Sequence, residues 1–308
     1  MKITRSVDLK NRGRGNAFVR WIKKDGPAWL IMMPFLITGI VFCWEPLLSG
    51  IRISFFETRG FETTEFVGFQ NYIDVITDSV FLTALKNTFI YTLWSIILGL
   101  FTPVFISLVL NELVHAKSFF RFATYFPCIV PGVVTSVMWL LMFYPGDGGV
   151  LNYIRSFMGL PALQWLNDPS MTIMLIVVTM TWGGAGSTAI LYLADLQSVN
   201  TDLYEAVSLD GGGIWRKFIH ITLPHMSGMI KMMFVMQIIS VFQVFQQPLT
   251  MTGGGPNNAS TTLAMVSYDY AFSTVEMGKS TATSVIMALM LLVFTVLYMR
   301  IKSHNMDE

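Results

Sequence analysis

The sequence predicts an all-α integral membrane protein with six transmembrane helices. Hydrophobic residues make up 53% of the 308 residues, charged residues make up 13%, and the mean hydropathy is +0.57. Soluble domains usually contain about 25% charged residues. Charge-free runs separate shorter polar segments, and each run supplies, alone or with its flanks, about the 20 residues that a helix needs to cross the hydrocarbon core. The bilayer is therefore the main solvent of this chain.

The spans are placed by these runs. The first run stops at Glu45, so we extend its helix to about Ile53 and place Glu45 and Arg52 towards the outer interface. The fifth run is too long for one span, and its glycine-rich cluster from Thr252 to Asn258 must be a loop. A basic segment at residues 1–28 precedes the six-helix domain, and a short tail follows it. The expected spans are 29–53, 87–111, 122–144, 171–194, 228–248 and 280–301, within a domain of residues 29–301 that is followed by the tail 302–308.

The orientation follows from the basic residues in the loops. If the N-terminus is cytoplasmic, the inner segments carry 14 Lys and Arg residues, whereas the outer loops carry four. Because Lys and Arg accumulate on the cytoplasmic side, both termini and the polar loop 202–226 are expected there. The basic N-terminal segment is interpreted as a topology anchor and not as a nucleic-acid arm, because the net charge is only +1. The long first apolar run, interrupted by Pro34, is not typical of a cleavable signal peptide.

The polar loop between the fourth and fifth spans predicts two short helices. Asp202 and Glu205 resemble a capping box, with both carboxylates at the positive end of the first helix. The run Gly211–Gly213 ends that helix. A second amphipathic helix is expected from Ile214 until Pro224 stops it. The residues alone leave two interpretations open, a docking surface for a partner and an amphipathic loop on the membrane surface.

The string EAVSLDGGG in this loop resembles a known signature. Together with Ile219, it is similar to the EAA motif of the membrane-spanning subunits of binding-protein-dependent ABC importers, in the form typical of carbohydrate permeases. Val207 stands where that family often has a second alanine, and Gly212 stands where alanine is common. The resemblance implies that the loop is a coupling helix seated in a cytoplasmic ATPase, oriented by Glu205 and turned at Gly211. The residues expected to couple to the ATPase are Glu205, Ala206, Asp210, Gly211, Leu223 and Pro224.

Three further segments resemble outer parts of the same family. They are 66–76, 148–170 and 249–261, and the last is typical of the permease type similar to the larger maltose permease subunit, although this chain is too short for that protein's extra N-terminal helices. An aromatic anchor and a run with almost no side chains suit contact with a partner, and a flexible connection is the alternative. The expected contacts with an extracytoplasmic binding protein are Trp165, Gly253, Gly254, Gly255 and Pro256.

The interiors of the second to fourth spans carry no Asp, Glu, Lys or Arg. Their absence disfavours the proton relays of many ion-driven carriers. Amides, hydroxyls and aromatic rings occur instead, and these suit an uncharged ligand with hydroxyl edges and apolar C–H faces. Such residues also serve as interhelical contacts or interfacial anchors. Gln243, Gln246 and Gln247 are spaced to share part of one face of the fifth span. The expected residues of the substrate pathway are Tyr91, Trp139, Trp182, Gln237, Gln243 and Gln246.

Cofactor chemistry has little support in this chain. Cys43 and Cys128 are the only cysteines, and both lie in expected spans, where they act as small apolar residues. His220 and His225 lack the spacing of a zinc helix. No phosphate-binding loop motif is present, so ATP and Mg are expected in a partner ATPase and no cofactor is expected in this chain. An integral-membrane enzyme would need a nucleophile with a nearby base or a metal cluster, which the spans do not offer.

The resemblance thus implies the transmembrane subunit of an ATP-driven ABC importer. It would pass a carbohydrate, expected to be an oligosaccharide, from an extracytoplasmic binding protein across the bacterial plasma membrane by alternating access. The expected partners are a second homologous permease in a heterodimer, two cytoplasmic ABC ATPase subunits, the solute-binding protein and the lipid bilayer, with no nucleic acid. The alternatives are an ABC permease for a glycerophosphodiester or polyol and an ion-coupled secondary carrier.

Overall fold

The computed structural model describes residues 12–146 and 148–304, and it divides the chain into two units at the end of Ile53. Two predictions fall partly outside the described residues. Residues 1–11 belong to the predicted basic segment, and residues 305–308 belong to the predicted tail.

The described part of the first unit, residues 12–53, is one continuous helix. α1 (Arg12–Gly39) passes through a π-helical turn, η1 (Ile40–Trp44), into α2 (Glu45–Ile53). A π-helical turn widens the helix locally without ending it. The apolar part, Gly26–Ile53, is long enough to cross a bilayer. This unit therefore supplies the first of the candidate membrane spans.

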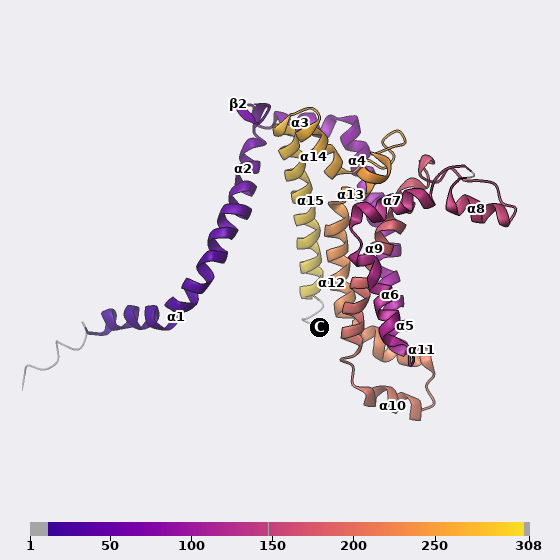
Figure 1. Cartoon of the computed structure of the whole chain (residues 1–308). Helices are drawn as coiled ribbons and strands as arrows, with labels where there is room; N and C mark the ends of the chain where they lie inside the picture. The colour runs from indigo at the N-terminus through magenta and orange to yellow at the C-terminus, as the bar shows by residue number, and fades with distance from the viewer. Residues whose placement is uncertain (1–11, 147, 305–308) are drawn as a thin grey trace, which may run out of the picture. The chain divides into compact units, whose positions relative to one another are not determined.

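The second unit is a helical bundle with short elements at both ends (Figure 1). In chain order its elements are β1 (Phe56–Arg59), β2 (Glu62–Phe66), α3 (Gln70–Thr77), α4 (Ser79–Ser95), η2 (Ile96–Leu100), α5 (Phe101–Glu112), α6 (Lys117–Ile129), α7 (Gly132–Met142), α8 (Val150–Phe157), η3 (Trp165–Asn167), α9 (Thr172–Leu196), α10 (Thr201–Leu209), α11 (Ile214–Lys217), η4 (Phe218–Thr222), α12 (Leu223–Phe242), α13 (Gln246–Thr252), α14 (Leu263–Phe272) and α15 (Met277–His304). The strands pair as an antiparallel hairpin. In Figure 1, α10 and α11 lie at one end of the bundle, whereas α3, α13 and α14 lie at the other.

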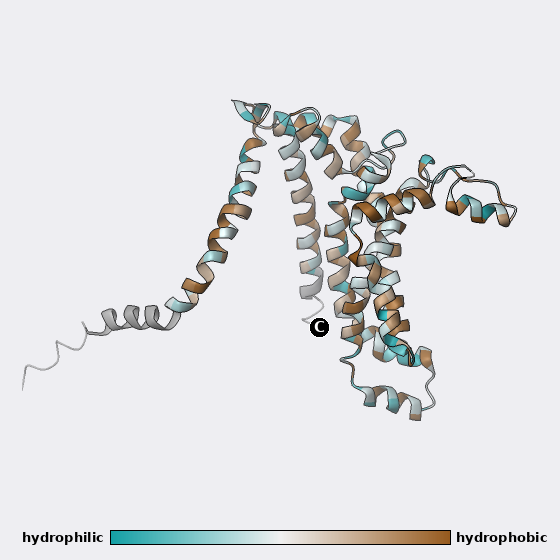
Figure 2. Cartoon of the chain, in the orientation of Figure 1, coloured by the Kyte–Doolittle hydropathy of each residue, from teal (hydrophilic) through white to brown (hydrophobic). Residues whose placement is uncertain are grey.

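The predicted fold class is confirmed by the length and composition of the helices. Among the described residues, five helices could cross a membrane, or six if the bent pair α6 and α7 is counted as one span. Figure 2 shows hydrophobic residues along α12 and α15. In α9, 44% of the most apolar stretch is buried, against 17% to 28% in the three other unbroken spans of this unit, so α9 is the most buried of these four.

The sequence predicted an uninterrupted span at 122–144, and the structure instead breaks it. α6 and α7 meet at an angle of 97°. Pro131 causes this break, because a residue that precedes a proline avoids the α conformation. Val130 accordingly adopts an extended backbone with φ −70° and ψ 129°. The short helix α7 can therefore take a different direction from α6.

Pro224 has the opposite outcome. The sequence predicted that it stops the second loop helix, but α11, η4 and α12 form one helical run from Ile214 to Phe242. The prediction was wrong because a π-helical turn, η4, ends at Thr222, and Leu223 and Pro224 then begin α12 without a break. Its wider hydrogen-bonding pattern accommodates a residue that has no N–H and whose ring would clash with the carbonyl four residues earlier. The fifth span consequently begins and ends earlier than the expected 228–248.

Candidate functional site

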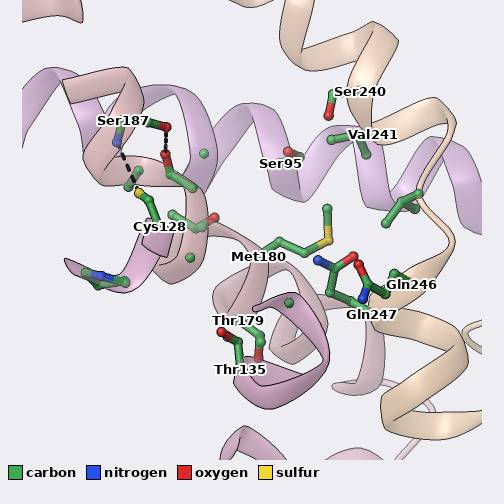
Figure 3. Close-up of a pocket in the computed structure, with 18 of the residues that line it drawn as sticks. Ser95, Cys128, Thr135, Thr179, Met180, Ser187, Ser240, Val241, Gln246 and Gln247 are labelled. Carbon is green, nitrogen blue, oxygen red and sulfur yellow. Dashed lines mark hydrogen bonds between the residues drawn. The ribbon is translucent and has the colours of Figure 1, made fainter. Parts of the chain in front are cut away.

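A cavity of about 680 Å³ lies within the second unit. It is lined where α4 meets η2, where α6 meets α7, along the middle of α9, and from the end of α12 to the start of α13. Figure 3 shows Gln246 and Gln247 at one side of this main cavity and Cys128 and Ser187 at another. The backbone N–H of Ser187 donates to the Cys128 Sγ at 3.3 Å. Cys128 therefore lines the cavity. The apolar residues beside it in the sequence did not indicate this position.

The polar groups of the main cavity are neutral. None of the described residues that line it is Asp, Glu, Lys or Arg. The lining offers hydroxyl and amide groups that can both donate and accept hydrogen bonds. These polar residues are Ser95, Thr135, Thr179, Thr181, Ser187, Thr188, Gln237, Ser240, Gln243, Gln246 and Gln247.

The glutamines predicted for the pathway meet at this cavity, but not by sharing a helix face. α12 ends at Phe242, and Gln243 is its C-cap with φ −102° and ψ 13°. α13 starts afresh at Gln246 after Phe245 has turned the chain, with φ −136° and ψ −54°. The predicted shared face of Gln243 and Gln246 on one helix is therefore wrong, although both residues line the cavity together with Gln237.

The side chain of Gln237 lies against the backbone at Gly99. Its side-chain amide donates a hydrogen bond to the Ser95 hydroxyl. A Cβ atom at Gly99 would lie 2.6 Å from the Gln237 Nε2 and 3.3 Å from the Ser95 Oγ. Gly99 thus provides the space in which the Gln237 amide lies, at the π-helical turn η2 that follows α4.

The aromatic residues predicted for the pathway do not line the main cavity. Trp139 stacks on Phe143 with ring centroids 5.1 Å apart and meets Trp182 edge to face at 6.0 Å. Tyr91 is fully buried, and its hydroxyl donates to the Ser260 carbonyl at 3.2 Å. The structure thus places Tyr91 in the packing core of the unit.

The buried polar residues of α4 hold the glycine-rich loop in place. The Asn87 side-chain amide donates to the carbonyls of Asn258 and Thr261 at 2.7 and 3.0 Å. The backbone N–H of Leu263 donates to the Thr88 hydroxyl at 3.3 Å. Buried backbone groups of a loop need such partners. The segment is therefore an ordered structure in the described part of the chain, and the alternative of a merely flexible connection does not describe it.

A second cavity of about 520 Å³ includes much of this loop. Gly253, Gly255 and Pro256 line it, together with residues that follow α7 and with Leu166. Gly253 adopts the left-handed conformation, with φ 57°, and closes the end of α13. Three of the residues predicted to contact a binding protein are thus brought to one cavity, whereas Gly254 is buried beside them.

Trp165 lies next to this second cavity, and its ring makes contacts with other residues of the same loop. Its indole N–H donates to the Asn152 Oδ1 at 2.9 Å, and the Arg155 guanidinium lies 6.0 Å from its ring centroid. The Asn152 amide also donates to the Gly146 carbonyl at 3.1 Å. Nearby, hydrogen bonds from the side chain and backbone of Ser170 lower the pKa of Asp168. Asn152 organises this loop, and no spacing in the sequence indicated it.

In the α10–α11 loop, the start of α10 differs from the prediction, whereas its end at the glycine run agrees with the prediction. The N-cap of α10 is Asn200, whose side chain accepts a hydrogen bond from the Asp202 N–H at 3.0 Å, so the predicted capping box at Asp202 is wrong. At the other end, the Gly211 N–H donates to the Ser208 carbonyl and the Gly212 N–H donates to the Val207 carbonyl. This pair of bonds is a Schellman motif, and Gly211 takes the left-handed φ of 75° that the motif requires.

Val207 and Gly212 differ from the EAA pattern at positions that touch. A Cβ atom at Gly212 would overlap the Val207 side chain. A larger residue at position 207 thus accompanies a smaller residue at position 212. That Cβ atom would also lie 2.8 Å from the Val207 carbonyl oxygen, so the tight turn after α10 favours glycine at position 212 whatever the side chain at position 207.

The loop presents apolar and polar groups to solvent. Glu205, Ala206, Asp210, Leu223 and Pro224 are all exposed. Large apolar side chains are exposed beside them, with Leu209 at 89%, Ile214 at 84% and Trp215 at 76%. Patches of exposed apolar side chains on a polar loop mark interaction sites.

Polar contacts fasten both ends of the loop to the bundle. The Tyr204 and Thr222 hydroxyls lie 3.0 Å apart and join α10 to η4. His225 Nε2 lies 3.1 Å from both the Asp195 carbonyl and the Ser198 hydroxyl, which connects the start of α12 to the end of α9. A force on α10 would therefore reach α9 and α12, two of the helices that line the main cavity.

The fold and the cavity define a multi-pass membrane permease. Residues 88–304 match the family of binding-protein-dependent transport system inner membrane components, and the chain belongs to this family. The family consists of ABC transporter permease subunits, which are not enzymes themselves, and it places the chain in the inner membrane.

Individual relatives cover nearly the whole chain. It is 30% identical over 285 residues to the probable ABC transporter permease protein YurN of Bacillus subtilis, covering 91% of this chain and 97% of the relative. It is 29% identical over 276 residues to the multiple sugar-binding transport system permease protein MsmF of Streptococcus mutans, and the match covers 89% of this chain and 94% of the relative. A crystal structure of a bacterial ABC transporter involved in the import of the acidic polysaccharide alginate matches with a TM-score of 0.84 at 22% identity, over 94% of this chain and 99% of that chain. This likeness confirms the predicted type I permease fold.

Proposed function

We propose that this chain is the transmembrane subunit of an ATP-driven importer that carries an uncharged carbohydrate of oligosaccharide size across the bacterial plasma membrane. The main cavity carries this proposal. Its volume of about 680 Å³ is within the range of about 300–1,000 Å³ that is usual for ligand pockets. Its hydroxyl and amide lining, without charged side chains among the described residues, suits a ligand that offers many hydroxyl groups. The sugar-transport name of the MsmF relative supports the same class of solute.

The remaining subunits would supply the energy and the solute. A second homologous permease would complete the path, and two cytoplasmic ATPase subunits would bind ATP and Mg. The exposed apolar side chains of the α10–α11 loop, Leu209, Ile214 and Trp215, support ATPase docking there. An extracytoplasmic solute-binding protein would dock at the opposite end of the bundle, over the glycine-rich loop. In this arrangement both termini would lie in the cytoplasm, as the distribution of basic residues predicts.

A glycerophosphodiester is a poorer match to the main cavity. Its phosphate carries a negative charge that would need Lys, Arg or a similar donor once it is removed from water. The described lining residues include no Lys or Arg. A polyol shares the chemistry of a sugar and remains a smaller variant of the same proposal.

The test is uptake by membrane vesicles that contain the assembled transporter and its binding protein. Radiolabelled maltotriose, raffinose and cellotriose form the panel of neutral saccharides, and glycerophosphoglycerol is the anionic control. We expect at least one saccharide to accumulate only when ATP is supplied on the side of the α10–α11 loop. Accumulation of glycerophosphoglycerol alone, or solute flux that needs no ATP, would contradict the proposal.

A further inference from the structure

The two cavities described above follow each other along the same pair of elements. Near its start, α7 lines the main cavity with Gly132 and Thr135, and near its end it lines the second cavity with Leu140 and Leu141. α7 packs against α13. The stretch that leads into α13 lines the main cavity at residues 243–247 and the second cavity at residues 250–253. The two cavities are thus consecutive spaces along one route between α7 and α13.

An apolar core separates these two spaces. Val241 and Val244 line the main cavity, Phe143 and Met251 line the second cavity, and all four belong to one hydrophobic cluster. Trp139 packs against this cluster and lines neither cavity. On α7 it stands between Thr135, which lines the main cavity, and Leu140, which lines the second cavity, so we assign it to the partition.

Trp139 has an unused polar group in this partition. Its indole Nε1 is buried and has no hydrogen-bond partner in the described part of the chain. Buried indole N–H groups usually find an acceptor, and leaving one unpaired is costly. The rings of Phe143 and Trp182 pack around the indole at 5.1 and 6.0 Å. Aromatic faces suit the apolar C–H face of a sugar, and the indole N–H suits one of its hydroxyl oxygens.

α7 is a short helix with a break in the helical backbone at each end. The extended Val130 and the following Pro131 separate it from α6 at an angle of 97°. Beyond its other end lies Gly146, with φ 86°. A displacement of this short helix away from α13 would join the two cavities.

We propose that Trp139 is the gate residue between the second cavity and the main cavity, and that its indole N–H donates to a sugar hydroxyl as the solute passes. The assignment rests on the proposed function for the nature of the solute. The partition itself is independent of the solute. The second cavity would then be the outer entrance of the pathway, and the apolar cluster around Trp139 would close it.

Cys128 provides the measurement, because it lines the main cavity behind the gate. The assembled transporter would be prepared in right-side-out vesicles with Cys43→Ser, so that Cys128 is the only cysteine of this chain. A membrane-impermeant sulfonated maleimide is added outside, and the modified peptide that contains Cys128 is quantified by mass spectrometry. We expect Trp139→Ala to label about tenfold faster than the parent, as when a closed state loses about 1.4 kcal/mol. The matched control is Phe157→Ala, which truncates an exposed aromatic residue of α8 outside both cavities.

Two further variants keep the test decisive. If Trp139→Ala fails to assemble, Leu140→Ala removes a neighbouring side chain of the partition and should also accelerate labelling. Trp139→Phe keeps an aromatic ring without the N–H, so labelling should stay at the parent rate while uptake of the fastest saccharide in the panel falls about fivefold. Unchanged uptake in Trp139→Phe would overturn the donor role.

The outcomes separate this inference from the proposed function. Labelling at the parent rate in both Trp139→Ala and Leu140→Ala overturns the gate, even if ATP-driven saccharide uptake is normal. Faster labelling in Trp139→Ala, when the parent transporter itself takes up no saccharide of the panel, supports the gate and contradicts the proposed function.

Discussion

Gln237 shows how a single missing side chain positions a polar group inside a membrane protein. Its amide extends across Gly99 to reach the Ser95 hydroxyl. In the membrane interior an amide without a partner is costly, so this hydrogen bond fixes the direction of the Gln237 side chain. The sequence predicted Gln237 in the pathway from its residue type, but it did not indicate Gly99, because a glycine in a transmembrane helix has many other roles.

We predict that Gly99→Ala weakens transport through Gln237. The new Cβ would lie 2.6 Å from the Gln237 Nε2, so the amide must leave Ser95. Loss of one such hydrogen bond corresponds to about a fivefold higher KM for saccharide uptake. The control is Gly183→Ala, because Gly183 lines the same cavity and a Cβ there meets nothing within 4 Å.

A double substitution tests the stated cause. In a Gln237→Ala background, Gly99→Ala should add little, because two changes that act on one contact are not additive. A further fivefold loss in the double variant would show that Gly99 acts by another route.

At the scale of whole elements, the end of α10 depends on one backbone conformation. The Schellman bonds that close it require the left-handed φ of Gly211. Gly213, two residues later, does not need a left-handed backbone, because it is extended with φ −78° and ψ −178°. Two of the three consecutive glycines are therefore needed for different reasons, Gly211 for its left-handed backbone and Gly212 for its close contact with Val207.

We predict that Gly211→Val uncouples the loop without preventing membrane insertion. A β-branched residue in the left-handed region costs about 1–2 kcal/mol, which would unwind the end of α10 and displace Leu209. ATP hydrolysis stimulated by the loaded binding protein should be lost in the assembled complex. Gly213→Ala is the matched control and should keep the stimulation, because its conformation suits any residue and a Cβ there is unobstructed. Normal stimulation in Gly211→Val would disprove the role of the Gly211 turn in coupling.

At the scale of the whole molecule, hydropathy was sufficient to predict the fold class but not the path of the chain. Long apolar runs predict spanning helices because the bilayer leaves few alternatives. Prolines gave an ambiguous signal, since Pro131 breaks a span and Pro224 does not. The difference lies in the neighbouring backbone, which is extended at Val130 and π-helical before Pro224. Such local adjustments depend on tertiary packing, which a hydropathy pattern does not contain.

The candidate site shows the same limit. The neutral character of the cavity was predicted from the absence of charged residues in the spans. The convergence of Gln237, Gln243 and Gln246 was predicted for the wrong reason, because the chain turns between Phe242 and Gln246. Cys128 and Ser95 also line the cavity, but they lie far in sequence from these glutamines, and no periodic pattern connects them.

The last prediction concerns the orientation of the second unit. The α10–α11 loop and α8 belong to opposite ends of the bundle in Figure 1. The excess of basic residues predicts that the first is cytoplasmic and the second extracytoplasmic. Leu209 is 89% exposed and Phe157 is 76% exposed, so a cysteine at either position is open to a water-soluble reagent.

We therefore expect opposite labelling of Leu209→Cys and Phe157→Cys in a Cys43→Ser, Cys128→Ser background. An impermeant maleimide should modify Phe157→Cys in right-side-out vesicles and Leu209→Cys only in inside-out vesicles. The parent without cysteine is the control for background reaction. The inverse pattern would place the α10–α11 loop outside, where no ATP-binding partner could reach it, and the coupling role of Glu205 and Gly211 would have to be abandoned.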